Sequence, residues 1–205
     1  MKIIKQHVKL EWITPNALET IEKIGRVCYK SEDNIINDSA KKFIQNIIKR
    51  GHHAVLEHAY ASFRIITDRG ISHELVRHRI ANYCQESTRY CNYSKEKFGN
   101  EISVIQPPHL DPKSYEIWYN ACEYAEKHYF ELLENNSPQI ARSVLPTCLK
   151  TELVMTANFR EWRHVLSLRA DKAAHPQVRE ISVMIYNILM KHHDIVFGDL
   201  EIGND

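Results

Sequence analysis

Hydrophobic and polar positions recur along this chain with two different periods, and each period predicts a different kind of element. Apolar side chains three or four residues apart predict amphipathic helices, whereas alternation predicts half-buried strands. The first pattern predicts helices over 16–29, 39–51, 112–134, 139–144, 159–168 and 176–193, and a short helix from Ser72. The second pattern predicts strands over 3–10, 59–67, 102–105 and 151–157.

This order of elements predicts an α+β fold, in which a mixed or antiparallel sheet is flanked by helices. The sequence contains no internal repeat, low-complexity tract or Gly/Ser-rich linker that would divide it. We therefore expect a single domain over residues 1–205, which is long enough to bury a hydrophobic core without disulfides or metals.

Composition disfavours several functional classes. The formal net charge is +1, so basic chemistry must be local and a general nucleic-acid-binding surface is disfavoured. No apolar run approaches the ~20 residues that span a bilayer, and the N-terminus is too short and charged for a signal peptide. The five cysteines are scattered without a CxxC pair, which is typical of free thiols in a reducing cytosol. We expect a cytoplasmic protein that binds neither nucleic acid nor a membrane.

The densest polar chemistry lies between residues 77 and 90. The tripeptide Arg77-His78-Arg79 is followed after seven residues by Ser87 and then by Arg89. Guanidinium groups so close together repel one another, and a fold tolerates this arrangement when an anion such as a phosphate completes the site. The segment is therefore a candidate anion-binding site.

Two local patterns predict how side chains of this segment meet. In an extended chain, Gln85, Ser87 and Arg89 would all point to one side, where they could hold a phosphate or a pyrimidine edge. On a helix, Glu74 would face the cationic residues three and four positions later, at 77 and 78.

A second polar cluster is Gly51-His52-His53-Ala54-Val55-Leu56-Glu57-His58. Its spacing fits neither the HExxH nor the HxxEH pattern, so we expect no metal site. A binding loop that precedes a strand fits this cluster better.

A third cluster lies in the helix predicted after Asn158. Its polar and aromatic side chains occupy two faces. One face holds Asn158, Trp162, Val165 and Arg169, and roughly the opposite one holds Arg160, His164 and Ser167. Such a helix is suited to a position between two partners, such as a ligand and another subunit. No GxGxxG or GxxxxGK[ST] string is present, so neither a Rossmann site nor a P-loop is expected.

Together the three clusters resemble the flavin-dependent thymidylate synthases. The family signature Arg-His-Arg-x7-Ser matches residues 77–87, and the element Gly-His-x4-Glu-His matches 51–58. The segment Ala141-Arg142-Ser143-Val144-Leu145-Pro146 then precedes the Asn158 cluster in the family's order. The resemblance implies a thymidylate synthase-complementing-type fold and the reductive methylation of dUMP to dTMP. It implies 5,10-methylenetetrahydrofolate as carbon donor, FAD as hydride carrier, NADPH as reductant, and a homotetramer with active sites at subunit interfaces.

The resemblance also assigns residues to the two ligands. The positions that match flavin contacts are His52, Arg77, His78, Arg79, Asn158, Arg160 and His164. The positions that match the dUMP pocket are Glu74, Arg77, Gln85, Glu86, Ser87, Arg89, Arg142 and Arg169.

Two of these residues are candidate catalytic groups. Arg169 matches the arginine that would polarise uracil, and a guanidinium beside the ring would stabilise enolate-like charge as carbon 5 becomes nucleophilic. Ser87 has no base beside it in the sequence, so we expect it to position the substrate rather than attack it. Cys84 is a rival nucleophile.

Two positions depart from the family's usual pattern, namely Asn82, where many members have serine, and Ala54, where a polar residue is more usual. Both bear on flavin or folate contacts. Two other functions are compatible with parts of the sequence. One is nucleic-acid binding by the arginine patch and its neighbouring tyrosines, and the other is a zinc hydrolase built on residues 51–58.

Overall fold

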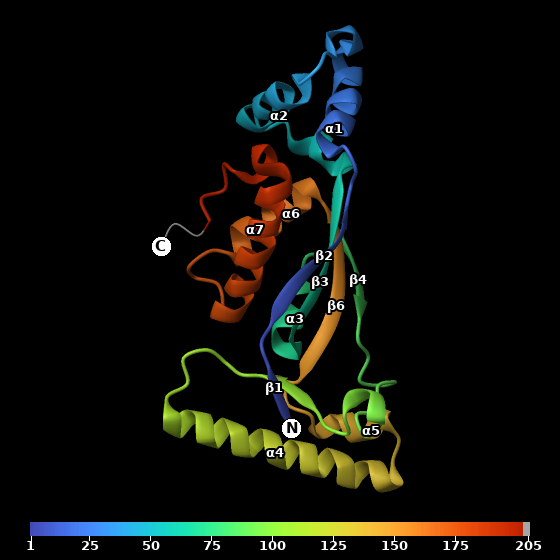
Figure 1. Ribbon diagram of the computed structural model, residues 1–205, viewed down its shortest axis with the longest axis vertical. Helices are drawn as coiled ribbons and strands as arrows, with labels where there is room; N and C mark the ends of the chain where they lie inside the picture. Colours follow the sequence, from blue (N-terminus) through green and yellow to red (C-terminus); the bar gives the residue numbers. More distant parts are fainter. Residues whose placement is uncertain (203–205) are drawn as a thin grey trace. The chain divides into compact units, whose positions relative to one another are not determined.

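A computed structural model describes residues 1–202. Backbone packing divides the chain into two compact units. Unit 1 comprises Met1–His7, Ile65–Arg77 and Cys84–Leu153, and unit 2 comprises Val8–Arg64, His78–Tyr83 and the residues from Val154 onwards. A four-stranded sheet has the order β2-β3-β6-β4, and the division falls within all four strands, which are β2 (His7–Ile13), β3 (Tyr60–Asp68), β4 (Ala81–Gln85) and β6 (Lys150–Asn158) (Figure 1).

The long helix α4 (Pro112–Asn135) is the largest element of unit 1. Asp111 caps it by accepting hydrogen bonds from the backbone N–H groups of Lys113 and Ser114 at 3.0 and 3.1 Å, and proline is favoured at the first helical position. Strand β1 (Lys2–Ile4) pairs in parallel with β5 (Ser103–Ile105). The core of the unit consists of Tyr93, Ile102, Val104, Cys122, Tyr129, Ala141 and Leu149.

Shorter helices complete unit 1. They are α3 (Arg69–Leu75), α5 (Pro138–Ala141) and the 3₁₀ helices Glu96–Phe98 and Arg142–Val144. Asp68 caps α3 by accepting from the N–H of Ile71 at 2.7 Å, which starts this helix at Arg69 rather than at the predicted Ser72.

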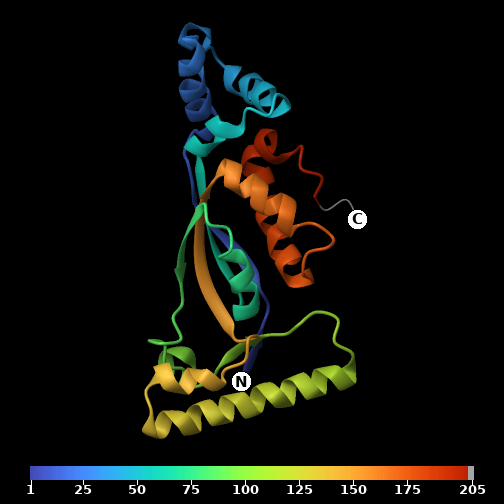
Figure 2. The same cartoon turned by 180° about the vertical axis from the view of Figure 1, so that it is seen from behind.

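Unit 2 contains α1 (Ala17–Arg26), α2 (Ser39–Lys49), α6 (Phe159–Arg169), α7 (Pro176–Phe197) and the 3₁₀ helices Val27–Tyr29, Glu32–Asn34 and His53–His58. Helices α6 and α7 lie side by side, as do α1 and α2 (Figure 2). The fully buried Trp162 fixes α6 to the sheet, since its indole N–H donates to the carbonyl of Ala61 at 3.0 Å and its ring meets Phe63 edge-on at 5.0 Å.

The predicted α+β class, with an antiparallel sheet flanked by helices, is confirmed. The predicted strand over 3–10 is instead two strands, β1 and β2, which end and begin on either side of residues 5 and 6. The expectation that residues 1–205 form one domain stays a prediction.

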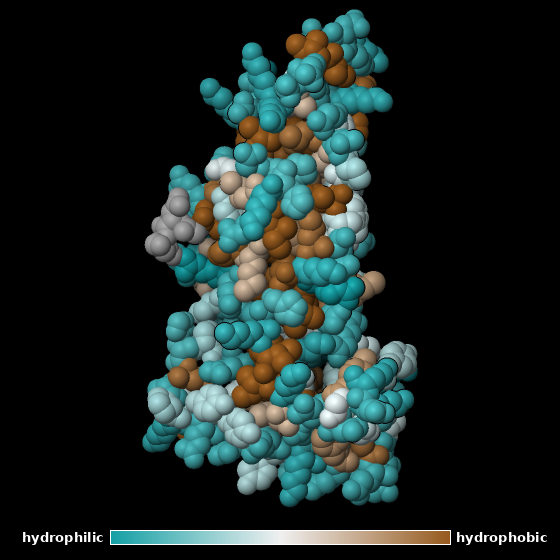
Figure 3. All heavy atoms as spheres, viewed as in Figure 1, coloured by the Kyte–Doolittle hydropathy of each residue, from teal (hydrophilic) through white to brown (hydrophobic). Residues whose placement is uncertain are grey.

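Hydrophilic side chains cover most of the face shown in Figure 3, and hydrophobic atoms form separate patches. Within residues 1–202, no helix combines the length and the apolar character needed to cross a membrane.

Candidate active site

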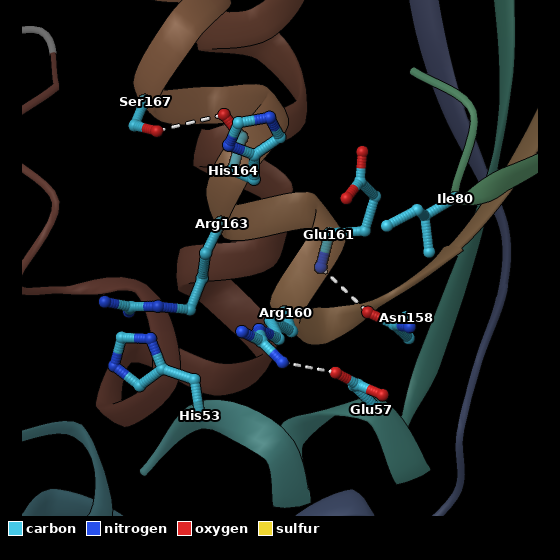
Figure 4. Close-up of a pocket in the computed structure, with 9 residues that line it drawn as sticks. All are labelled: His53, Glu57, Ile80, Asn158, Arg160, Glu161, Arg163, His164 and Ser167. Carbon is cyan, nitrogen blue, oxygen red and sulfur yellow. Dashed lines mark hydrogen bonds and ion pairs between the residues drawn. The ribbon is translucent and has the colours of Figure 1, made fainter. Parts of the chain in front are cut away.

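A pocket of about 540 Å³ lies in unit 2 beside the N-terminal half of α6 (Figure 4). Its lining residues are His53, Glu57, Ile80, Asn158, Arg160, Glu161, Arg163, His164 and Ser167. The volume falls in the range of small-molecule and cofactor sites, ~300–1,000 Å³. Most of the lining comes from one helix, so a single element sets the geometry of the pocket.

The N-terminus of α6 is fixed by Asn158. Its side-chain Oδ1 accepts a hydrogen bond from the N–H of Glu161 at 2.8 Å, which satisfies one of the free donors of the first turn. Arg160 on the same turn forms an ion pair with Glu57 at 2.6 Å, and both side chains are about half exposed. A helix N-terminus with an adjacent arginine favours an anionic ligand.

His78 holds Arg169 in unit 2. The Nε–H group of Arg169 donates to Nε2 of His78 at 3.0 Å, and Glu161 Oε1 lies 3.5 Å from the other ring nitrogen, Nδ1. Tyr83 donates its hydroxyl to the carbonyl of His78 at 2.7 Å. The ring of His164 meets the His78 ring nearly edge-on, with centroids 5.9 Å apart.

Protonation states follow from this packing. Burial, the Arg169 guanidinium and His164 lower the pKa of His78 to about 4. A neutral imidazole has one acceptor and one donor nitrogen, so Nε2 accepts from Arg169 and the Nδ1 proton faces Glu161. Burial raises the pKa of Glu161, and burial together with Glu161 raises the pKa of Tyr83 to about 12.

In unit 1, β4 ends at Gln85 and the chain then turns. The amide of Gln85 donates to the hydroxyls of Ser72 and Thr151 at 2.9 and 3.1 Å. The carbonyl of Ser87 accepts from the N–H groups of Tyr90 and Cys91 at 3.1 and 2.9 Å, which closes the turn.

Glu86 is anchored on the same turn. Its carboxylate accepts from Lys150 Nζ at 2.7 Å and from the hydroxyl of Tyr93 at 2.8 Å, and its backbone N–H donates to the carbonyl of Glu152 at 2.8 Å. Burial and the neighbouring Glu86 carboxylate raise the pKa of Tyr93. Both carboxylate oxygens of Glu86 are therefore engaged.

Arg89 and Arg142 flank this turn. Arg89 donates to the side-chain oxygen of Gln139 at 3.1 Å, and Arg142 donates to the hydroxyl of Thr88 at 3.3 Å. Within residues 1–202, neither guanidinium forms a salt bridge with a carboxylate. Two exposed cations with only neutral hydrogen-bond partners are a suitable site for a phosphate.

Two expectations about geometry need correction. Gln85, Ser87 and Arg89 do not alternate on one extended strand, because β4 ends at Gln85 and residues 87–91 form a turn. The helix that was expected to align Glu74 with residues 77 and 78 ends at Leu75. Within unit 2, it is Glu161 that faces His78.

The pocket contains only some of the predicted flavin-side residues. It contains Asn158, Arg160 and His164, whereas the exposed His52 lines a separate, apolar pocket of about 450 Å³ in the same unit. Arg77 and Arg79 are exposed and line neither pocket.

Sequence reasoning did not assign His53, Glu57, Ile80, Glu161 or Arg163 to the site. Arg163 is a structural residue, because its guanidinium forms two hydrogen bonds with Asp199, at 2.5 and 2.7 Å, and one with the carbonyl of Val196. The only available signal for Glu161 was its place in an Arg-Glu-Trp-Arg-His string, which is also typical of a solvated helix.

A metal ion fits this arrangement poorly. Ligand atoms of His78, Glu161 and His164 lie within 4.8 Å of one another, but the Arg169 guanidinium beside the same imidazole disfavours a second cation. Among the described residues, the 51–58 cluster does not gather three or more ligand atoms, and Glu57 is paired with Arg160.

An organic anion fits the pocket better. Nε2 of His53 is buried and has no hydrogen-bond partner in the described part of the chain, so a polar ligand atom would satisfy it. The α6 N-terminus offers positive potential in the same pocket, and a bound anion would compete with Glu57 for Arg160.

Comparison with known proteins extends these observations. The family model described as "Thymidylate synthase complementing protein" matches residues 9–193. A flavin-dependent thymidylate synthase of Mycolicibacterium vanbaalenii is 34% identical over 203 aligned positions, which cover 89% of this chain and 79% of that protein. A flavin-dependent thymidylate synthase of Corynebacterium glutamicum is 33% identical over 219 positions, with coverages of 94% and 84%.

Solved structures show the same fold. Thymidylate synthase X of Helicobacter pylori, solved with FAD and dUMP, has a TM-score of 0.77 and 23% identity, and the match covers 95% of this chain and 98% of that chain. The UMP/dUMP methylase PolB of Streptomyces cacaoi, bound with 5-Br dUMP, has a TM-score of 0.81 and 22% identity, with coverages of 97% and 96%. Because the family model and the curated relatives each match most of the sequence, this chain belongs to the flavin-dependent thymidylate synthase family of enzymes.

Proposed function

We propose that this chain catalyses the reductive methylation of dUMP to dTMP in the cytoplasm, with 5,10-methylenetetrahydrofolate as carbon donor, FAD as hydride carrier and NADPH as reductant. Membership of the family supports the reaction class. The assignment of a nucleotide substrate rests on Arg89 and Arg142 beside the turn after β4. Neither arginine has a carboxylate partner among residues 1–202.

The proposed nucleotide site uses the residues of this turn. Arg89 and Arg142 would bind the phosphate through charge-assisted hydrogen bonds. The hydroxyl of Ser87 accepts from the N–H of Arg89 at 3.3 Å, which leaves its proton available to donate to a ligand. Glu86, fixed by Lys150, would keep the turn in the conformation that presents these groups.

The unit 2 pocket is the proposed flavin site. Arg160 and the α6 N-terminus would bind phosphate oxygens, and His53 would donate to or accept from a polar atom of the cofactor. When bound, FAD would supply the hydride that reduces the transferred one-carbon unit. The residues themselves bind, orient and exclude water.

Arg169 would be the residue that activates the pyrimidine. The hydrogen bond to His78 holds its Nε–H group, and the planar guanidinium would donate to a ring carbonyl of the bound substrate. The guanidinium would stabilise negative charge on that oxygen as carbon 5 attacks the one-carbon donor. A neutral His78 suits this role, because a protonated imidazole could not accept from Arg169.

We also infer a homotetramer with active sites at subunit interfaces. Helix α6 supports this inference, since it buries Trp162 and Val165 while Arg160, His164 and Ser167 remain on its surface. A helix with such a polar, cofactor-side face is suited to meeting another subunit.

The absorption spectrum of the purified protein is the first test. We expect flavin bands, or their appearance when FAD is added, and bleaching of these bands by NADPH without oxygen, with and without dUMP. Adding methylenetetrahydrofolate should then yield dTMP, detected by chromatography. A colourless protein that takes up no FAD and binds single-stranded DNA would contradict the proposal and favour nucleic-acid binding.

Substrate binding can be tested separately. Arg142→Gln should raise the Kd for dUMP about 10- to 100-fold, because a hydrogen bond to a charged group contributes ~1.5–3 kcal/mol. The control is Lys127→Gln, whose side chain is 65% exposed on α4 in the same unit. Equal affinity of the two variants, measured by calorimetry, would remove Arg142 from the nucleotide site.

A further inference from the structure

Two cysteines of unit 1 lie close enough to react with each other. Cys122 on α4 and Cys148, two residues before β6, have sulfur atoms 3.4 Å apart. All five cysteines are free thiols. A disulfide requires a sulfur separation of ~2.0 Å, so each sulfur has to move by about 0.7 Å, which is within ordinary thermal displacements.

The two thiols differ in reactivity. The hydrogen bond with Cys122 lowers the pKa of Cys148 to about 7, although burial opposes this effect. The same hydrogen bond and burial raise the pKa of Cys122, which is 2% exposed. Cys148 is partly exposed, so it is the thiol that can ionise and meet an oxidant, with Cys122 behind it as the resolving thiol.

Trp118 on α4 supplies an independent observation. Its indole N–H is buried without a hydrogen-bond partner among residues 1–202, and Trp118 contributes to the lowered pKa of Cys148. A thiolate at Cys148 would give this donor an acceptor. The structure thus contains a buried donor that ionisation of Cys148 would satisfy.

We propose that Cys122 and Cys148 form a site of reversible oxidation, at which a peroxide converts them into an intramolecular disulfide. The Cys148 thiolate attacks one oxygen of hydrogen peroxide, the O–O bond breaks, and hydroxide leaves to give a sulfenic acid. The Cys122 thiol attacks that sulfur, its proton passes to the departing hydroxyl, and water leaves. The two thiols lose two electrons, and the peroxide, with the two thiol protons, becomes two water molecules.

The disulfide would fasten α4 to the chain just before β6. Leu149 is buried in the core next to Cys148, and Lys150 follows it and holds Glu86 at 2.7 Å. Oxidation would therefore stiffen the strand start that supports the turn after β4. The chemistry itself rests on the thiol pair and does not depend on the proposed function.

The test uses the full chain treated with one equivalent of hydrogen peroxide, then denatured, alkylated and mapped by mass spectrometry. We expect three alkylated cysteines instead of five, a disulfide-linked peptide pair that contains Cys122 and Cys148, and recovery of all thiols with dithiothreitol. The reaction rate should rise as pH increases through about 7, as expected for the Cys148 thiolate. Five alkylated thiols, or a disulfide that uses another cysteine, would overturn the proposal.

Variants separate the two roles. Cys122→Ser should leave a sulfenic acid on Cys148 that dimedone traps, whereas Cys148→Ser should abolish both the disulfide and the trapped species. The matched control is Cys28→Ser, which changes an exposed cysteine and should oxidise like the unaltered protein. A disulfide-linked Cys122 in the Cys148→Ser variant would contradict the assigned order. The wild-type experiment is decisive even if a variant fails to fold.

Discussion

Arg169 donates from Nε to Nε2 of His78 at 3.0 Å, while Glu161 faces Nδ1 of the same ring at 3.5 Å. This arrangement requires a neutral imidazole, and the pKa of His78 is lowered to about 4. Between about pH 6.5 and about pH 4, the unfolded chain therefore binds a proton at this histidine that the folded chain does not bind. Its contribution to stability is complete above pH 6.5 and is lost as pH falls toward 4.

The variant His78→Gln tests the direction of this pH dependence of stability. Glutamine cannot be protonated in this range, and its amide oxygen can still accept from Arg169. We expect the free energy of unfolding to fall less between about pH 7 and about pH 5 in the variant than in the unaltered protein. Urea denaturation at both pH values measures the difference. Glu161, whose raised pKa acts in the opposite direction, and His164 are present in both proteins, so parallel pH dependences would refute the assignment.

Ser87 is placed as a positioning residue. Its hydroxyl oxygen accepts from the N–H of Arg89 at 3.3 Å, and no histidine or carboxylate within residues 1–202 is hydrogen-bonded to it in the way that an activated nucleophile requires. We expect Ser87→Ala to lower kcat/KM about 3- to 10-fold, because one neutral hydrogen bond contributes ~0.5–1.5 kcal/mol.

Steady-state kinetics check the Ser87 prediction, with Ser94→Ala, an exposed serine of the same unit, as control. A folded Ser87→Ala protein that binds dUMP and has no turnover would show that Ser87 is the nucleophile. Cys84 is exposed, and we expect Cys84→Ala to retain turnover. Loss of turnover in that variant, with dUMP binding intact, would point to Cys84 instead.

At the scale of elements, the sequence pattern predicted the bounds of a helix or strand correctly where interactions within that segment determine its structure. Helix α4 spans 112–135 against a prediction of 112–134, because Asp111, Pro112 and the apolar periodicity all act within the segment itself. The prediction was wrong where hydrogen bonds to one backbone carbonyl ended an extended segment. Two N–H groups share the carbonyl of Ser87, so the extended chain that was expected to continue to Arg89 turns instead.

The site residues show the same limit. The arginines and histidines of the 77–90 and 158–170 segments were identified as a constellation because their types are unusual together. Glu161 was missed because its partner, His78, is far away in sequence, and a glutamate between arginines is typical of a solvated helix face. His52 and His53 are adjacent and identical, so only the 3₁₀ helix that begins at His53 decides which one lines the larger pocket.

The N-terminus of α6 gives a prediction about an element. Asn158 caps the helix through its Oδ1 atom, and it is also a proposed flavin contact. Asn158→Ala should reduce stability by about 1 kcal/mol and weaken FAD binding, whereas Asn158→Asp should keep the cap and still weaken FAD binding through loss of the amide donor. Thermal unfolding and flavin titration separate the two effects. If Asn158→Asp binds FAD as tightly as the unaltered protein, this residue is only a cap.

At the scale of the whole molecule, the candidate residues for each ligand belong mostly to one of the two units. The dUMP-side residues Glu74, Gln85, Glu86, Ser87, Arg89 and Arg142 belong to unit 1, and the flavin-side residues His52, His78, Arg79, Asn158, Arg160 and His164 belong to unit 2. Arg169, which we propose acts on the pyrimidine, belongs to unit 2 and Arg77 to unit 1. The proposed oligomer then raises the question of whether one chain supplies both sets to one active site.

Subunit mixing answers this question. We consider Arg142→Gln, which damages the proposed nucleotide side, and Arg169→Lys, which removes the planar guanidinium. If each active site takes the two sets from different subunits, random mixed oligomers contain sites with both sets intact, and about a quarter of the wild-type activity should return. If one chain supplies both sets, every site carries one defect, and the mixture should be no more active than its components.

The mixture is made by co-expressing the two variants with different tags and purifying over both tags, and dTMP formation is measured against each variant alone. The control mixes Arg89→Gln with Arg142→Gln. These arginines flank one turn of unit 1, where Arg142 donates to Thr88 beside Arg89, so the two defects fall on the same side of a site and no activity should return. Recovery in this control, or its absence in the first mixture, would contradict active sites assembled from different subunits.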